Sequence, residues 1–99
     1  MLLIFDMSSM FESCYLLTSL DLSNFDTKNV IDMNSLFYGS SKLKYIDISY
    51  FKYNDTSKDS SYINLFNSLP SSGTIKISQN FYDIIKDEVP KNWEIKFNE

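Results

Sequence analysis

A segment of the chain returns at a fixed spacing. The run Asp6-Met7-Ser8-Ser9-Met10-Phe11 recurs twenty-six residues later as Asp32-Met33-Asn34-Ser35-Leu36-Phe37. Residues 17–25 recur at the same offset as residues 43–51. A fixed period of this length is typical of chains that stack one small unit on the next, because no single unit buries its own apolar side. The repeat therefore predicts one domain built by adding similar units.

A third and more divergent copy follows at an offset of twenty-nine residues. Residues 65–66 align with residues 36–37, and residues 75–78 align with residues 46–49. The three additional residues fall within the polar stretch 50–60, which we expect to loop out. Asp59 stands where the earlier copies have apolar residues, so this unit's helix should begin later or pack less well. We expect units of approximately residues 1–25, 26–51 and 52–78.

Apolar spacing within each unit predicts a short helix. In the second copy Val30, Met33, Leu36 and Phe37 recur on one face of a helix, with Asn29 placed to cap it. The first copy repeats this face with its own apolar residues, which are Ile4, Met7, Met10 and Phe11.

A half-buried strand is predicted in each unit by strict alternation of apolar and polar residues. Ile46 and Ile48 alternate with polar neighbours. One strand and one helix per unit predict an α/β fold with parallel strands and right-handed crossovers. Two inward rows should then stack across the units, and they are Leu20–Ile46–Ile75 and Leu22–Ile48–Ile77.

The last residues, 79–99, predict a terminal cap made of a helix and a strand. Ser78 or Asn80 is placed to cap the helix, and Pro90 stops it. The apolar face of this helix is Phe81, Ile84, Ile85 and Val89, and the apolar side of the strand is Trp93, Ile95 and Phe97.

The first strand is expected to have an open edge. The chain begins inside the helical half of a unit, so the strand around Leu20 is covered at best partly by residues 1–5. An open edge invites pairing with another chain or with further upstream repeats. We therefore predict self-association.

Composition excludes several functional classes. A net charge of −4 gives no basic surface for nucleic acid, and the short apolar run at residues 2–5 is too short to span a membrane. The chain has no histidine, one cysteine and two glycines, so zinc sites and glycine-rich phosphate loops are not expected. We expect neither an enzyme nor a cofactor or metal centre.

The strand segments resemble those of leucine-rich repeats. The spacing Leu17-x-x-Leu20-x-Leu22-x-x-Phe25 recurs in the second copy. The fuller run through residues 20–33 closely resembles the BspA-type leucine-rich repeat family of bacterial and protist surface proteins. The resemblance implies a short leucine-rich-repeat-like solenoid, the carboxyl-terminal part of a secreted or cell-surface protein. It further implies an adhesion or recognition surface for a protein or glycan on a host or neighbouring cell.

The outward row of the predicted strands is the candidate binding surface, since stacked strands form a wide, rigid face. Tyr45 is its one aromatic residue. The full row is Ser19, Asp21, Ser23, Tyr45, Asp47, Ser49, Thr74, Lys76 and Ser78. Asp21 and Asp47 should lie side by side, as a weak cation or hydroxyl site, as a carbohydrate-active pair, or as part of a solvated polar face.

Two further readings stay open. The chain is either an adhesion module or a truncated fragment that only folds and self-associates. Four tyrosines form either a second contact patch or a cover over the core, and they are Tyr38, Tyr50, Tyr53 and Tyr62.

Overall fold

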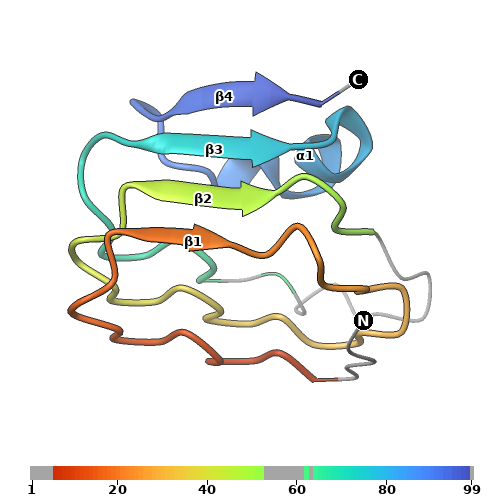
Figure 1. Cartoon of the computed structure of the whole chain (residues 1–99), viewed down its shortest axis with the longest axis horizontal. Helices are drawn as coiled ribbons and strands as arrows, with labels where there is room; N and C mark the ends of the chain where they lie inside the picture. The colour runs from red at the N-terminus through yellow and green to blue at the C-terminus, as the bar shows by residue number, and fades with distance from the viewer. Residues whose placement is uncertain (1–5, 53–61, 63, 99) are drawn as a thin grey trace.

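A computed structural model describes residues 6–52, 62 and 64–98, which form a four-stranded parallel sheet with one short α-helix (Figure 1). The strands lie in chain order, β1-β2-β3-β4. Their bounds are Ser19–Asp21 for β1, Tyr45–Ile48 for β2, Thr74–Ile77 for β3 and Glu94–Phe97 for β4. The helix α1 spans Gln79–Ile85, and a 3-10 turn, η2, spans Lys86–Glu88.

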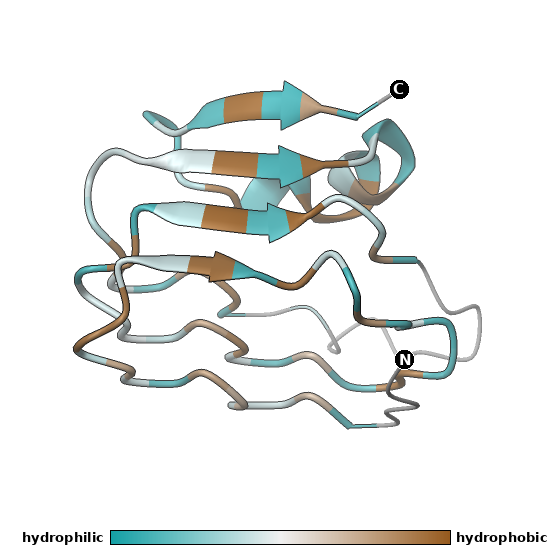
Figure 2. Cartoon of the chain, viewed as in Figure 1, coloured by the Kyte–Doolittle hydropathy of each residue, from teal (hydrophilic) through white to brown (hydrophobic). Residues whose placement is uncertain are grey.

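The register of the sheet follows the repeat. Leu20 pairs with Ile46, Ile46 with Ile75, and Ile75 with Ile95, all in parallel strands. The predicted parallel pairing and the predicted inward row are therefore confirmed. Alternation sets this register because a slip by one residue would turn every inward isoleucine to solvent. Figure 2 shows the apolar bands of neighbouring strands in line.

The helix predicted in each of the first two units is wrong. Residues 33–40, which include Met33, Leu36 and Phe37, form successive turns instead, with hydrogen bonds from Leu36 N to Met33 O and from Tyr38 N to Ser35 O. Residues 7–13, which include Met7, Met10 and Phe11, also form successive turns. Of the other two residues assigned to the predicted helices, Ile4 lies outside the described residues and Val30 precedes the turns of its unit. Asn29 therefore caps no helix. Asp59, which led us to expect a later or less well packed helix in the third unit, also lies outside the described residues.

A positive backbone φ recurs along these turns and explains why they are not helices. Ser9 and Ser13 have φ of 57° and 55°, and the equivalent Ser35 and Gly39 have φ of 60° and 75°. A helix cannot contain such residues. Because the kink returns every four residues, it brings side chains inward at the same spacing as a helix does.

The turns of successive units are joined by a second ladder of hydrogen bonds. Met7, Ser9, Phe11 and Ser13 each donate a backbone N–H to a carbonyl of the second unit, at 2.7–2.9 Å. Phe37 and Gly39 donate in the same way to Leu65 and Asn67, at 3.1 and 2.8 Å. Alternate N–H groups thus pair between units much as they do in a sheet. In Figure 1 these segments run side by side below the strands.

One core lies between the sheet and the turns. Ile46, Ile75 and Ile77 are fully buried on the sheet side. On the turn side the rings of Phe11, Phe37 and Phe66 stack, with centroids 6.2 and 5.6 Å apart. The burial of aliphatic and aromatic side chains from successive units in one cluster is the main stabilising contribution.

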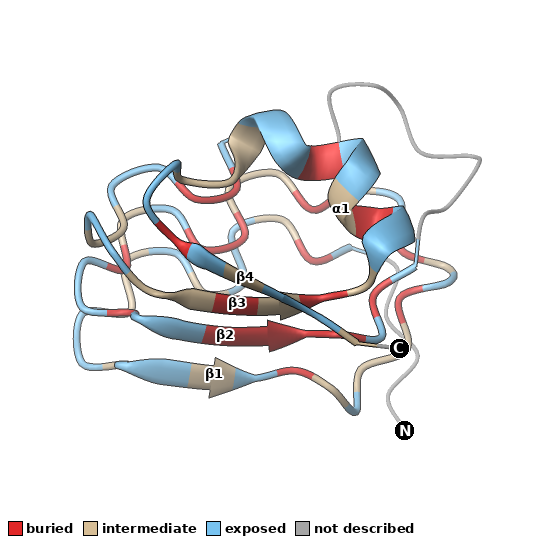
Figure 3. Ribbon diagram, turned by 90° about the horizontal axis from the view of Figure 1, so that it is seen from above, coloured by how far each residue is buried: buried red, intermediate tan, exposed pale blue. Residues whose placement is uncertain are grey.

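The predicted cap is confirmed in its elements. Ser78 caps α1, its hydroxyl accepting the Phe81 N–H at 3.2 Å. Phe81 and Ile85 are buried, whereas Ile84 is 41% exposed, so its predicted place on the buried face is wrong. Phe81 and Ile85 are four residues apart and share one face of α1, whereas Ile84 lies about 100° around the helix from Ile85. Figure 3 shows α1 on the inner side of the sheet, where the turns of the earlier units also run.

Candidate recognition surface

The outward face of the sheet carries two rows of polar side chains in register. One row holds Ser19, Tyr45, Thr74 and Glu94, and the next holds Asp21, Asp47, Lys76 and Lys96. The second row places two carboxylates beside two ammonium groups. Glu94 and Lys96 belong to the cap strand and were not among the predicted site residues. Their alternation with apolar residues in the sequence already indicated that they lie on the outward face.

Burial divides the predicted site residues into three groups. Ser19, Asp21 and Tyr45 are exposed, and Ser23, Thr74, Lys76 and Ser78 are half-buried. Asp47 and Ser49 are only 8% and 3% exposed. Ser49 lies past the end of β2, where its carbonyl accepts a hydrogen bond from the Asn98 side chain at 3.0 Å. Little of Asp47 or Ser49 is therefore accessible on the predicted contact surface.

Asp21 and Asp47 lie side by side, as predicted, and both close local turns. The Oδ1 atom of Asp21 accepts a hydrogen bond from the Ser23 N–H at 2.9 Å, and the Oδ1 atom of Asp47 accepts one from the Ser49 N–H at 3.0 Å. Three other aspartates, Asp6, Asp26 and Asp32, likewise accept a hydrogen bond from the backbone N–H two residues further along the chain. These are Asx turns, which aspartate favours.

Hydrogen bonds also control the ionisation of Asp21. The Ser23 hydroxyl and N–H lower the pKa of Asp21 below its usual 3.8, with a smaller contribution from the positive charge of Lys76. A lowered pKa keeps this carboxylate ionised at neutral pH. Asp21 is therefore a hydrogen-bond acceptor and is poorly suited to donate a proton.

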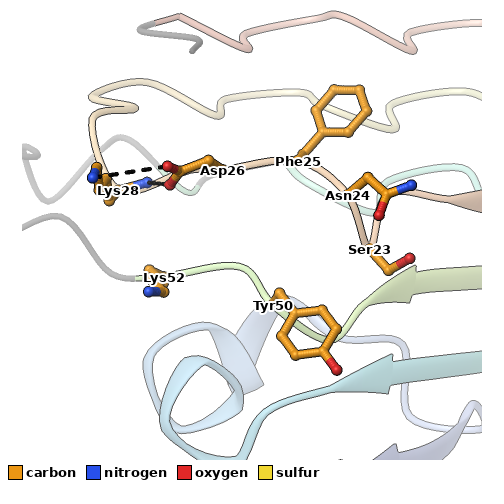
Figure 4. Close-up of a pocket in the computed structure, with 7 residues that line it drawn as sticks. All are labelled: Ser23, Asn24, Phe25, Asp26, Lys28, Tyr50 and Lys52. Atoms are coloured by element: carbon orange, nitrogen blue, oxygen red, sulfur yellow. Dashed lines mark hydrogen bonds and ion pairs between the residues drawn. The ribbon is translucent and has the colours of Figure 1, made fainter. Parts of the chain in front are cut away.

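A second feature is a pair of open pockets at the exit edge, where the strands end, and Figure 4 shows the first of them. The first has a volume of about 600 Å³ and is lined by Ser23, Asn24, Phe25, Asp26, Lys28, Tyr50 and Lys52. The second has about 580 Å³ and is lined by Ser49, Tyr50, Phe51, Lys52, Ser78, Asn80, Phe81 and Asn98. Tyr50 and Lys52 line both pockets, and Tyr50 is 60% exposed.

The loops of the exit edge are held together by a buried hydroxyl. Thr27 is fully buried, and its Oγ1 accepts the Lys52 N–H at 2.7 Å. Nearby, the Lys28 ammonium lies 4.0 Å from the Asp26 carboxylate. Tyr50 stands in the repeat where the first unit has Asn24 and the third has Gln79. This divergence from the repeat is visible in the sequence, but it does not by itself indicate a pocket.

The three tyrosines that the structure describes, out of the four considered, divide between the contact-patch and the core-cover alternatives. Tyr38 and Tyr50 are exposed, whereas Tyr62 is buried and its ring meets Phe81 edge-on at 5.8 Å. Tyr53 lies outside the described residues. Within residues 6–52, 62 and 64–98, no group of three or more His, Cys, Asp or Glu side chains is arranged to hold a metal ion.

Comparison with known proteins identifies one family. A family model described as a Mycoplasma protein of unknown function, DUF285, matches residues 2–86. Neither the curated proteins nor the solved structures gave a match. Among the described residues, no helix is long and apolar enough to cross a membrane.

Proposed function

The chain belongs to the DUF285 family, and we propose that it is a non-enzymatic recognition or adhesion module. We further propose that its units form a short leucine-rich-repeat-like solenoid, of the BspA type, within a secreted or cell-surface protein. The observation that carries the proposal is the register of the four parallel strands. It holds side chains from every unit on one face, which suits contact with an extended protein or glycan.

The contact surface that we propose is centred on Tyr45. This side chain is 37% exposed and has Ser19 and Thr74 on either side in its row. Tyrosine is favoured at the centres of interfaces, because it combines a large apolar ring with a polar tip. Asp21 at one end and Lys76 further along supply charges of opposite sign. Each unit would contribute a weak contact, and additional units would strengthen binding.

The rival reading as a carbohydrate-active enzyme has less support. Glycoside hydrolysis needs one carboxyl group with a raised pKa to protonate the leaving oxygen. The pKa of Asp21 is lowered, and an Oδ1 atom of each aspartate is already bound by a backbone N–H. These observations favour a structural use of the pair.

The exit edge is a second candidate contact surface for the same function. Tyr50 is more exposed than Tyr45 and lies between two pockets. Because the strands end at this edge, one ligand could extend from the sheet face onto it.

A binding screen with matched tyrosine variants tests the proposal. The whole chain is applied to an array of purified extracellular glycoproteins and free glycans, and saturable hits are measured by biolayer interferometry. We expect Tyr45→Ala to weaken binding by at least about tenfold, as expected for loss of an interface anchor. Tyr15→Ala is the control, because Tyr15 is 61% exposed but precedes β1 and stands outside the two polar rows.

The outcomes separate the surfaces. A loss with Tyr50→Ala and none with Tyr45→Ala would move the site to the exit edge. Saturable binding that is unchanged in both variants would reject both surfaces as the site. The absence of saturable binding on the array would reject recognition in favour of a fragment that only folds and self-associates. Turnover of a glycan, abolished by Asp21→Asn, would support the enzyme reading.

A further inference from the structure

The first unit ends in an incompletely covered section of the core. Met10 is 39% exposed, whereas Leu36, its equivalent in the second unit, is fully buried. The same difference holds for other inward positions. Half-buried side chains of the first unit correspond to buried ones in the second, and they are Phe11, Leu17, Leu20 and Phe25. Together with Met10 they form what we call the end face.

The backbone of β1 also faces outward at this end. Leu22 donates its N–H to Asp47 O at 2.9 Å, and Thr18 O accepts from Tyr45 N at 3.3 Å. In a parallel ladder, alternate residues of a strand bond to the same neighbour, so residues 18, 20 and 22 face β2. The N–H and C=O groups of Ser19 and Asp21 therefore point away from β2. Among the described residues no strand lies on that side.

We propose that the end face binds a second copy of this chain, with the two β1 strands antiparallel about a two-fold axis through Leu20. Ser19 of one copy then lies opposite Asp21 of the other. These are the residues whose backbone groups point outward, so each such pair exchanges two hydrogen bonds. The symmetry sets each Asp21 against a serine and not against the other Asp21.

The size of the end face fits a dimer. The Cα extents of the molecule are 32 × 28 × 26 Å. A full section across it is therefore of the same order as the ~800 Å² per partner of standard specific interfaces. Interfaces of this size have dissociation constants from the micromolar range downward, so a dimer should be populated at micromolar concentrations of the chain.

The opposite end of the stack fits the end face less well. There β4 presents Glu94 and Lys96, and α1 exposes Gln79, Asn80 and Asp83. Charged residues on an edge strand discourage pairing. Although α1 also exposes Ile84 and β4 exposes Phe97, head-to-tail contact would set the apolar end face against several charged and polar groups, whereas two end faces match in character. A closed dimer is therefore favoured over a growing filament.

Sedimentation equilibrium of the whole chain tests this dimer. Wild-type protein from about 1 to 300 µM is expected to show a dimer, either alone or in equilibrium with the monomer. Ser19→Pro removes an outward N–H that β2 does not use, a substitution that edge strands tolerate. It should raise the dissociation constant at least about tenfold. Circular dichroism establishes that each variant is folded.

A matched pair of charge substitutions provides a second readout. Met10→Glu places a carboxylate on the end face, and Ile84→Glu places one on α1, at a side chain of similar exposure. We expect the first to weaken the dimer and the second to leave it unchanged. A monomer throughout the range, oligomers larger than the dimer, or a dimer insensitive to both Ser19→Pro and Met10→Glu would overturn the proposal. These results do not depend on Tyr45, so they are independent of the recognition test.

Discussion

Ser40 is the side chain that joins the first two units most directly. It is fully buried, its hydroxyl donates to Phe11 O, and its Oγ accepts from Cys14 N at 2.6 and 3.0 Å. One hydroxyl therefore satisfies two backbone groups of the preceding unit. Cys14 occupies the same place in the first unit, where it is half-buried. The repeat alone places Cys14 and Ser40 at equivalent positions, but it does not reveal the hydrogen bonds that Ser40 makes.

Replacing Ser40 should destabilise the fold without changing its shape. Ser40→Ala leaves the Cys14 N–H and the Phe11 C=O without this partner inside the protein, which costs about 1–3 kcal/mol of unfolding free energy. Ser41→Ala is the control, because Ser41 is exposed, and it should change stability by less than about 0.5 kcal/mol. Urea unfolding followed by circular dichroism measures both. Equal stability of the two variants would show that the Ser40 bonds contribute nothing.

At the scale of elements, the sequence was sufficient for the strands and misleading for the turns. Ile46 and Ile48 alternate with polar residues, a pattern that in a short stretch only a strand explains. Met33, Leu36 and Phe37 have a spacing shared by a helix and by turns that repeat every four residues. The distinguishing signal was the residue type at the positive-φ positions. Ser35 and Gly39 are both poor helix formers, and Gly39 adopts φ of 75°.

Gly73 fixes the entry to β3. A Cβ atom added there would lie 2.7 Å from Lys44 O and 2.7 Å from the ring of Trp93. The first contact is with backbone, which cannot move without disturbing the bond from Thr74 N to Lys44 O at 2.8 Å. Trp93 is itself held, because its Nε1–H donates to Pro70 O at 2.9 Å. The strand entry and the cap thus depend on one close approach.

The Gly73→Ala variant should therefore be destabilised by about 1–3 kcal/mol, the usual cost of inserting a group into a packed site. Ser72→Ala, at the exposed neighbouring position, is the control and should be nearly neutral. Thermal unfolding followed by Trp93 fluorescence reports both the stability and the environment of the indole. A variant as stable as wild type would mean that the close contact relaxes freely.

At the scale of the whole molecule, two ladders hold one core between them. The sheet was predictable because its rows follow from the repeat, and the cap was predictable from Ser78, Pro90 and the alternation before Asn98. The exit edge was not, because a pocket depends on how loops such as those around Tyr50 and Thr27 lie against each other. The burial of Ser49 was likewise hidden, since Asn98 reaches it from forty-nine residues away.

The central claim is that successive units share one interior in parallel register, and nuclear Overhauser effects between methyl groups test it most directly. With isoleucine and leucine methyls labelled, Ile46 is expected to show contacts to both Leu20 and Ile75, its partners in β1 and β3. Contacts from Ile46 to only one of them, or Hα–Hα contacts typical of antiparallel pairing between β2 and β3, would contradict the account.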